Sequence, residues 1–188
     1  VAGFGRLRPL GVDVDVAPAV RALDRLDAWL DETYRDILKR QITTGASQLT
    51  PQIALYLYAR RFYLKDKSVA EQHRTALDYF LDQARRYALS MRARQSQGHL
   101  ALALNRFGDT ETAQAILKSL KEKSVTDPEL GRYWRDPEST WWWHDAPVET
   151  QALMIEAFDE VGKDAAVVDG CQVWLIKQKQ TQDWRTTK

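Results

Sequence analysis

The chain has 188 residues, 44% of them apolar, with only 9 glycines and 6 prolines, which excludes a disordered or loop-rich polypeptide. This length is enough for one well-cored domain, so we expect a single domain over residues 1–188. Basic (27) and acidic (26) residues nearly cancel, and the charge balance therefore indicates no nucleic-acid partner. The lone cysteine, Cys171, excludes an internal disulfide, and no signal peptide or long apolar run is present. Because the sequence starts at Val1, we expect an excised piece of a longer protein whose targeting segment lies elsewhere.

Helical patterns account for the first third of the chain. Apolar residues within residues 4–10, followed by a glycine, indicate the last turns of a helix, and a short extended link follows. Three- and four-residue apolar spacing predicts a long amphipathic helix from about Pro18 to Ile42. Thr50 is a candidate N-cap for a helix from Pro51 to Leu64. That helix has almost no polar face before its last turn, which predicts burial on more than one side.

The middle of the chain predicts further helices and then an irregular segment. Ser68 and Glu71 have the spacing of a capping box, which predicts a helix start. Further helices are expected over residues 93–107 and from Thr110 onward. Residues 125–146 contain two prolines, Pro128 and Pro137, and four of the seven tryptophans, and the prolines argue against one continuous helix.

The last forty residues predict an antiparallel helix pair. Pro147 fits the first turn of a helix that would end at Gly162 as its C′ residue, and a second amphipathic helix begins at Asp164. Cys171 and Trp174 lie on the apolar stripe of the second helix. We therefore expect Cys171 to be buried and unreactive, and Trp174 to anchor the core against the preceding helix.

The fold class indicated by these patterns is all-α, because no segment sustains the two-residue alternation of a strand. Successive helical hairpins of similar length would make every second helix an inner, apolar one. From the residues alone, such hairpins could be arranged either in a ring or in an open stack.

Candidate metal and catalytic residues are few. His73, His99 and His144 fall in three different elements without the spacing of metal ligands, so no metal or other cofactor is expected. Nucleophile-elbow, phosphate-loop and dinucleotide motifs are absent from the sequence.

Three aspartates share one face of the long first helix. Asp24, Asp27 and Asp31 could be imagined as a carboxylate site, but arginines flank them on the same helix. We expect them to form an exposed charged face and no site.

The aromatic loop is the candidate interaction surface. Trp141, Trp142 and Trp143 are consecutive and cannot all point the same way, so at least one is expected to be partly exposed. Trp134 and His144 complete the candidate surface, which would suit a protein partner or a sugar. The alternative is that the loop folds back and plugs the mouth of a helical ring.

Three stretches of the chain resemble one protein family. Val1-Ala2-Gly3-Phe4-Gly5-Arg6-Leu7, the helix start Ala146-Pro147-Val148-Glu149-Thr150-Gln151-Ala152-Leu153 and the stretch from Trp174 to Trp184 are similar to the thioester-type domain of bacterial alpha-2-macroglobulins, in particular the forms found in Bacteroidetes-like bacteria. The likeness spans essentially the whole chain. It implies an α/α toroid, of which the chain forms an incomplete ring. This toroid would belong to a very large, multidomain protein that traps proteases after its bait region is cleaved.

The resemblance also implies partners and a location. The partners would be the other domains of the parent chain and, through the full-length protein, proteases. The location would be the periplasm, the cell envelope or the extracellular space. The chain itself would have no enzymatic activity and no cofactor.

The sequence departs from the family at the thioester. The family motif is Cys-x-Glu-Gln, whereas Cys171 stands in Gly170-Cys171-Gln172-Val173 and cannot form this bond. In the family the motif lies upstream of a position such as Val1. Some thioester relatives use a histidine in acyl transfer, and His144 matches it by neighbourhood only.

Two other functions remain open from the sequence. Toroids of this kind also occur in polysaccharide-active enzymes, which would need carboxylates or Tyr, His and Arg side chains converging in a cleft. A helical-repeat scaffold for protein interactions would instead expose a long concave groove. Whichever holds, an excised piece should expose apolar faces at its ends, so self-association of the isolated chain is expected.

Overall fold

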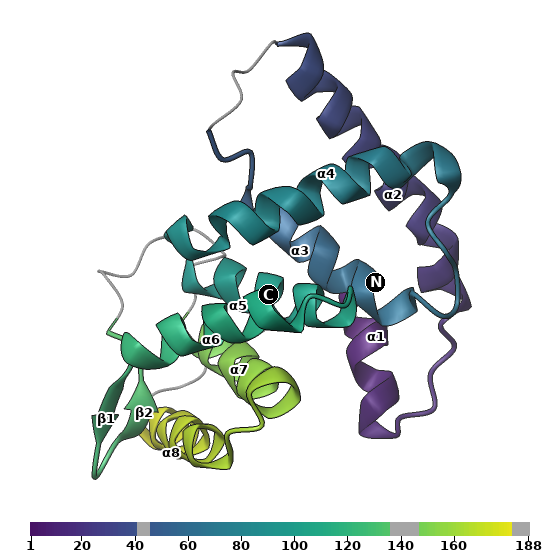
Figure 1. Cartoon of the computed structure of the whole chain (residues 1–188). Coiled ribbons are helices and arrows are strands. Elements are labelled where there is room, and N and C mark those ends of the chain that lie inside the picture. The colour runs from purple at the N-terminus through teal and green to yellow at the C-terminus, as the bar shows by residue number, and fades with distance from the viewer. Residues whose placement is uncertain (41–45, 136–146, 182–188) are drawn as a thin grey trace.

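The computed structural model describes residues 1–40, 46–135 and 147–181. These ranges contain α1 (Ala2–Leu7), α2 (Ala17–Lys39), α3 (Pro51–Arg60), α4 (Glu71–Tyr87), α5 (Arg94–Arg106), α6 (Thr110–Glu122), α7 (Pro147–Ala157) and α8 (Ala165–Thr181), with strands β1 (Val125–Asp127) and β2 (Gly131–Tyr133) (Figure 1). Short 3₁₀ turns η1 (Arg8–Leu10), η2 (Arg61–Tyr63) and η3 (Ala88–Ser90) extend three of the helices, and the π-helical turn η5 (Phe158–Gly162) extends α7. The expectation of a mostly helical fold is confirmed.

Alternate helices form an inner row. α5 packs against α3 on one side and α7 on the other, while α6 packs along α5, α8 along α7 and α2 along α4 (Figure 1). Every residue of α5 from Gln95 to Leu104 is buried, and α3 is buried from Ile53 to Arg60 except Leu55. The expected inner position of α3 is confirmed. A closed ring is not seen among the described residues.

The main core joins helices α2 to α8. Its largest fully buried apolar side chains come from five helices and η5, and they are Leu30, Ile53, Leu57, Phe80, Leu100, Leu102, Leu104, Ile116 and Phe158. A smaller cluster of Ala19, Leu23 and Tyr63 holds the first half of α2 against η2. Burial of apolar surface at about 25 cal/mol per Å² is the main favourable term for such a fold.

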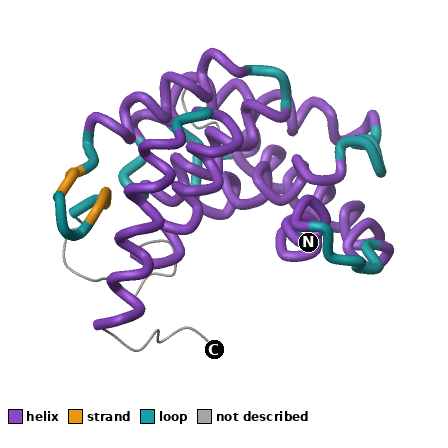
Figure 2. The backbone as a smooth tube through the Cα atoms, turned by 90° about the horizontal axis from the view of Figure 1, so that it is seen from below, coloured by secondary structure: helices purple, strands orange, loops and turns teal. Residues whose placement is uncertain are grey.

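The β1–β2 hairpin lies in the stretch that the sequence indicated as irregular. Val125 pairs with Tyr133 in antiparallel register, and Asp127 Oδ1 accepts hydrogen bonds from the backbone N–H groups of Glu129 and Leu130, both 2.8 Å. Figure 2 shows the hairpin at one end of the molecule. Strands of three residues are too short for a detectable alternation, so the all-α expectation omitted them.

One expected helix N-cap is confirmed and one is wrong. The Thr50 hydroxyl accepts from Ile53 N (3.2 Å), as expected. Asp109, which was not a predicted cap, also caps a helix, since its Oδ1 accepts from Thr112 N (3.0 Å). The predicted capping box at Ser68 is absent, because α4 starts only at Glu71. The N-cap residue is Ala70, whose side chain makes no hydrogen bond to the helix. The link before α4 is held extended, since Arg60 Nη2 donates to the carbonyl oxygen of Lys67 (2.7 Å).

The end of α7 differs from the prediction by one residue. The helix widens into the π turn η5, and the left-handed residue that ends it is Lys163 (φ 49°) instead of Gly162. A π turn adds one residue to the helical turn and so moves the left-handed cap one position along the chain.

The exposed aspartate face expected on α2 is wrong for two of its three residues. Asp24 is exposed, but Asp27 and Asp31 are only 3% and 7% exposed. Helices α3 and α4 cover this side of α2 and supply Arg60 and His73 as neighbours of these carboxylates.

The two expectations for α8 have different outcomes. Cys171 is fully buried, as expected, and burial raises its thiol pKa to about 12 against an opposing effect of the Arg132 charge. Trp174 is only half-buried and is therefore not the expected core anchor. Its ring stacks on Tyr133 of the hairpin, with centroids 6.3 Å apart, because β2 covers that side of α8.

Candidate functional site

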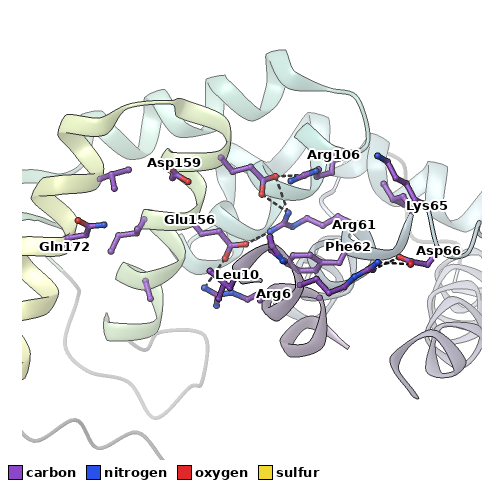
Figure 3. Close-up of a pocket in the computed structure, with 18 residues that line it drawn as sticks. Arg6, Leu10, Arg61, Phe62, Lys65, Asp66, Arg106, Glu156, Asp159 and Gln172 are labelled. Carbon is purple, nitrogen blue, oxygen red and sulfur yellow. Dashed lines mark hydrogen bonds and ion pairs between the residues drawn. The ribbon is translucent and has the colours of Figure 1, made fainter. Parts of the chain in front are cut away.

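The candidate site is a cavity of about 880 Å³ between the two ends of the described chain (Figure 3). One wall is α1 with η1, the opposite wall is α7 with α8, and the ends of α3 and α5 close the back. The lining residues are Gly5, Arg6, Arg8, Pro9, Leu10, Arg61, Phe62, Leu64, Lys65, Asp66, Arg106, Ala152, Ile155, Glu156, Asp159, Glu160, Val168 and Gln172.

Arg61 is the central residue of the cavity. Its side chain is only 1% exposed, and it donates through Nη1 to both oxygens of Glu160 (3.1 and 3.2 Å) and through Nη2 to Glu156. The guanidinium carbon lies 4.1 Å from the ring centroid of Phe62 and 4.6 Å from that of Tyr58. Two carboxylates and two aromatic faces therefore fix this buried cation.

Arg6 and Arg106 bind the same two glutamates from the outside. Arg6 Nη2 lies 3.2 Å from Glu156 Oε2, and Arg106 Nε donates to Glu160 Oε1 (2.7 Å). Arg6 is in the last turn of α1 and Arg106 is the last residue of α5, where a cation also interacts favourably with the helix dipole. We call Arg6, Arg61, Arg106, Glu156 and Glu160 the Arg–Glu cluster.

The sequence places both glutamates on one face of the chain, since Glu156 and Glu160 are four residues apart across the end of α7. Burial alone would raise the pKa of Glu160, but the hydrogen bond from Arg106 and the charges of Arg61 and Arg106 outweigh it and lower that pKa. Glu160 is therefore ionised at neutral pH. Such a carboxylate is unsuited to donate a proton as a general acid.

Tyr58 and His99 lie beside the cluster. Tyr58 Oη donates to Glu156 Oε2 (2.8 Å), and its ring centroid is 4.6 Å from that of His99. Burial, and then the Glu156 charge, raise the pKa of Tyr58, while burial and the charges of Arg61 and Arg6 lower the pKa of His99 to about 3. At neutral pH, both side chains are uncharged. The arrangement is suited to holding charge in place, and Tyr58 is a poor proton acceptor.

The candidate interaction surface expected from the sequence is only partly described. Trp134 is 5% exposed, its indole N–H donates to the carbonyl oxygen of Leu120 (2.8 Å), and its ring stacks on Phe158. Trp134 is therefore a core residue, which corrects its assignment to a surface. Trp141, Trp142, Trp143 and His144 lie outside the described residues.

The cavity residues were not candidates in the sequence. Arg61 was visible as a charge at the end of an apolar helix, and Glu156 as a charge within the apolar run of α7. A charged residue on an otherwise apolar, buried helix requires a partner of opposite charge, so Arg61 and Glu156 are the sequence features that could indicate this site. The partners themselves are far away in sequence, with Glu156 following Arg61 by 95 residues.

The described residues form neither a metal-ligand cluster nor a membrane-spanning helix. Within the described ranges, no three histidine, cysteine, aspartate or glutamate residues are grouped as metal ligands. In the same part of the chain, no helix combines the length and apolar character needed to cross a membrane.

Comparison of the chain with protein-family models, with curated proteins and with solved structures found no match. The function is therefore argued from the sequence resemblance and from the geometry of the fold and the cavity.

Proposed function

We propose that the chain is a non-catalytic part of the thioester-type α/α toroid of a large alpha-2-macroglobulin-like protein that traps proteases. The proposal starts from the three stretches that resemble this family, residues 1–7, 146–153 and 174–184. The alternation of inner and outer helices supports it, because successive hairpins of a toroid place every second helix on the inside.

The contact between Arg6 and Glu156 carries the proposal. In a straight stack, α1 and α7 would be separated by three spacings of the inner row, about 24–30 Å at the usual 8–10 Å between packed helices. Instead, Arg6 of α1 lies 3.2 Å from Glu156 of α7. An inner row that curves back on itself would account for this contact, and the contact therefore supports an arc of a ring over an open, straight scaffold.

The stretch 146–153, the second that resembles the family, has a structural role that supports the proposal. Gln151, within the first turns of α7, is 3% exposed and donates through Nε2 to the carbonyl oxygens of Arg132 (2.7 Å) and Cys171 (3.3 Å). One side chain thus joins the hairpin, α7 and α8. The hairpin and α8 would be held in place by the stretch that resembles the family.

Partners and location follow from the same proposal. The chain would pack against other domains of its parent and would meet proteases only as part of the full-length protein. The parent would act in the periplasm, the cell envelope or outside the cell. Its chemistry at the thioester would not involve Cys171, which is buried and in the wrong motif.

One observation favours a polysaccharide-active enzyme as the second candidate. Tyr58, Arg61, His99 and Glu156 converge beside the cavity, and these are the residue types that such an enzyme uses. Against this candidate, the pKa of Tyr58 is raised, and its hydroxyl is already bonded to Glu156. A catalytic tyrosine base requires the opposite shift.

Protease trapping by the full-length parent tests the proposal. A tagged parent protein is mixed with a panel of endopeptidases and pulled down before and after bait cleavage. Retention of protease only after cleavage is expected, and no retention at any stage would overturn the proposal. Release of unsaturated or reducing sugars from acidic polysaccharides by the isolated chain would instead support the enzyme.

Self-association is a further part of the proposal for the isolated chain. Large apolar side chains at its two ends are exposed, among them Leu10 (75%) and Ile176 (59%). Exposed apolar faces favour association. Sedimentation over a range of concentrations should show a mass that rises with concentration, and a constant monomer would contradict this part.

A further inference from the structure

The Arg–Glu cluster has more hydrogen-bond donors than acceptors. Each oxygen of Glu156 already accepts two hydrogen bonds or ion pairs, and Glu160 is bound by Arg61 and Arg106. Within the described ranges, the buried Nε of Arg61 has no acceptor. Three guanidinium groups and two carboxylates leave the Arg–Glu cluster with a net charge of +1, and its buried part is screened by water less than an open surface is.

The unused donors lie on the rim of the cavity. The side chains of Arg6 and Arg106 are 45% and 54% exposed, and each binds its glutamate through a single nitrogen. Lys65 is exposed on the same rim and forms no ion pair within the described ranges, whereas neighbouring Asp66 is held by Arg8 (2.8 and 3.1 Å). Figure 3 shows Arg6 and Arg106 on opposite sides of Arg61. The rim therefore offers cationic donors at separate points.

Apolar side chains form much of the remaining cavity wall, beside Asp159 and Gln172. Leu10 of η1 is exposed, and Ala152, Ile155 and Val168 line the opposite side from α7 and α8. Phe62 is covered by Arg61 on one face and lies against Gly5, where an added Cβ would come within 2.5 Å of the ring. The cavity thus combines an apolar wall with a cationic rim.

We propose that this cavity binds an acidic peptide segment, with carboxylates at Arg6, Arg106 and Lys65 and an apolar side chain against Leu10 and Ile155. Charge complementarity selects the peptide. A nucleic acid or polyuronate has a dense charge on every unit and would meet the carboxylates of Glu156, Asp159 and Glu160 as well as the cations. A peptide can place single carboxylates beside cations and apolar side chains between them. The proposal does not depend on the parent being a protease trap.

Binding of a defined probe to the native chain is the first measurement. The probe is a short fluorescein-labelled peptide of alternating glutamate and leucine, acetylated and amidated so that its ends carry no charge. Fluorescence polarisation should show saturable binding that weakens as salt is added. The matched peptide with lysine in place of glutamate should not bind. Equal binding of both peptides, or binding of neither, would overturn the proposal.

Charge reversal on the rim is the second measurement. Lys65→Glu and Arg106→Glu should each weaken binding of the acidic peptide at least about tenfold, the effect of losing one charge-assisted contact and adding a repulsion. Lys118→Glu on α6 is the matched control, because Lys118 is exposed and does not line the cavity. Lys65 makes no ion pair in the described structure, so Lys65→Glu tests the rim even where Arg106→Glu unfolds. Equal affinity of the Lys65→Glu and Lys118→Glu variants would refute the assignment.

Competition separates the peptide from other polyanions. Unlabelled Glu–Leu peptide should displace the probe, while heparin, polygalacturonate and single-stranded DNA at the same charge concentration should not. Displacement by any of these polymers with higher affinity than the peptide would reject the peptide as the ligand. Protease trapping by the parent reads out a different property, so a failure of one proposal leaves the other standing.

Discussion

Asp27 of α2 and Arg60 of α3 form an ion pair that is almost closed to solvent. Arg60 Nε lies 3.0 Å from Asp27 Oδ1, and their side chains are 0% and 4% exposed. Tyr56 donates to the same carboxylate oxygen (2.7 Å), and Arg60 also donates to the carbonyl oxygen of Lys67. The pair therefore ties α2, α3 and the link before α4 together through fully buried polar groups.

Removing one partner of this pair should be costly. Asp27→Ala leaves the Arg60 charge buried without a carboxylate, and a loss of about 3–5 kcal/mol in the free energy of unfolding is expected. Asp24→Ala on the same helix removes an exposed partner of Lys67 and should cost less than about 1 kcal/mol. Urea denaturation of both variants measures the difference, and equal losses would show that the buried pair is not formed in solution.

Arg60 also shows where sequence reasoning stops. Apolar spacing predicted α3 and its burial, and Thr50 predicted its start, because both depend on residues close together in the chain. The apolar pattern of this helix stops at Arg60-Arg61, which predicts a polar face there. Both arginines are buried, with Asp27 lying 33 residues before Arg60 and Glu156 lying 95 residues after Arg61. Periodicity identifies which positions are apolar, but it does not give the distant partner that makes a buried charge acceptable.

The segment after α6 shows a second limit. Its prolines predict a break in the helical pattern, but the hairpin that forms there depends on packing against α8. Once β2 covers α8, Trp134 enters the core beside Phe158, and Trp174 stacks on Tyr133 at the edge. Trp134 is therefore the core residue and Trp174 the edge residue, the reverse of the prediction. This outcome depends on the contact between β2 and α8, which are about forty residues apart, and no local sequence pattern contains such a contact.

Gly131 should be among the least replaceable glycines. Its φ is 80°, and a Cβ built on it would lie 2.3 Å from the carbonyl oxygen of Gly170 in α8. Gly11 has a similar φ of 75° with open space around it, so it is a matched control. Gly11→Ala should cost about 1–2 kcal/mol from backbone strain alone. Gly131→Ala should cost about 1–3 kcal/mol more, because a backbone atom cannot move aside as a side chain does.

Thermal or urea unfolding of the two glycine variants measures this difference. A second readout is the fluorescence of the native protein, since displacing β2 from α8 would change the stacking of Trp174 on Tyr133. Equal destabilisation by the two substitutions would show that β2 does not approach α8 as closely as the structure has it.

The Trp134 side chain should contribute more to the free energy of unfolding than the Trp174 side chain does. Trp134→Ala removes a 5% exposed indole, its stacking on Phe158 and its hydrogen bond to Leu120, and should cost about 3–5 kcal/mol. Trp174→Ala removes a half-buried ring at the edge of the hairpin and should cost about 1–2 kcal/mol. Trp134→Phe should fall between them, because the Leu120 carbonyl loses its donor while most of the packing remains. Denaturant unfolding of the three variants gives the order, and a larger loss for Trp174→Ala would reverse this assignment of the core.

His99 should make the fold less stable in mild acid. Its pKa is about 3 in the folded protein, lowered by burial and by the charges of Arg61 and Arg6, against about 6.5 in an unfolded chain. The unfolded state therefore binds a proton that the folded state does not take up between these values. His99 therefore does not reduce the free energy of unfolding above about pH 6.5. As the pH drops from there toward 3, protonation of His99 in the unfolded state lowers the free energy of unfolding by up to about 1.4 kcal/mol per pH unit. Between pH 7 and pH 5 the loss should be about 2 kcal/mol.

His99→Gln tests the assignment, because glutamine is polar and does not titrate. The variant is expected to be less stable than the native protein at pH 7, since it loses the ring contact with Tyr58. Its free energy of unfolding should nevertheless fall less between pH 7 and pH 5, by about 2 kcal/mol, than that of the native protein. Glu160 affects stability at lower pH than His99 does. Its pKa is lowered in the folded protein, so its carboxylate stabilises the fold at neutral pH and loses this contribution only as the pH falls through the folded-state pKa. Urea titrations at pH 7, 6 and 5 therefore isolate the histidine, and parallel stability curves for the two proteins would show that His99 is not held neutral beside the Arg–Glu cluster.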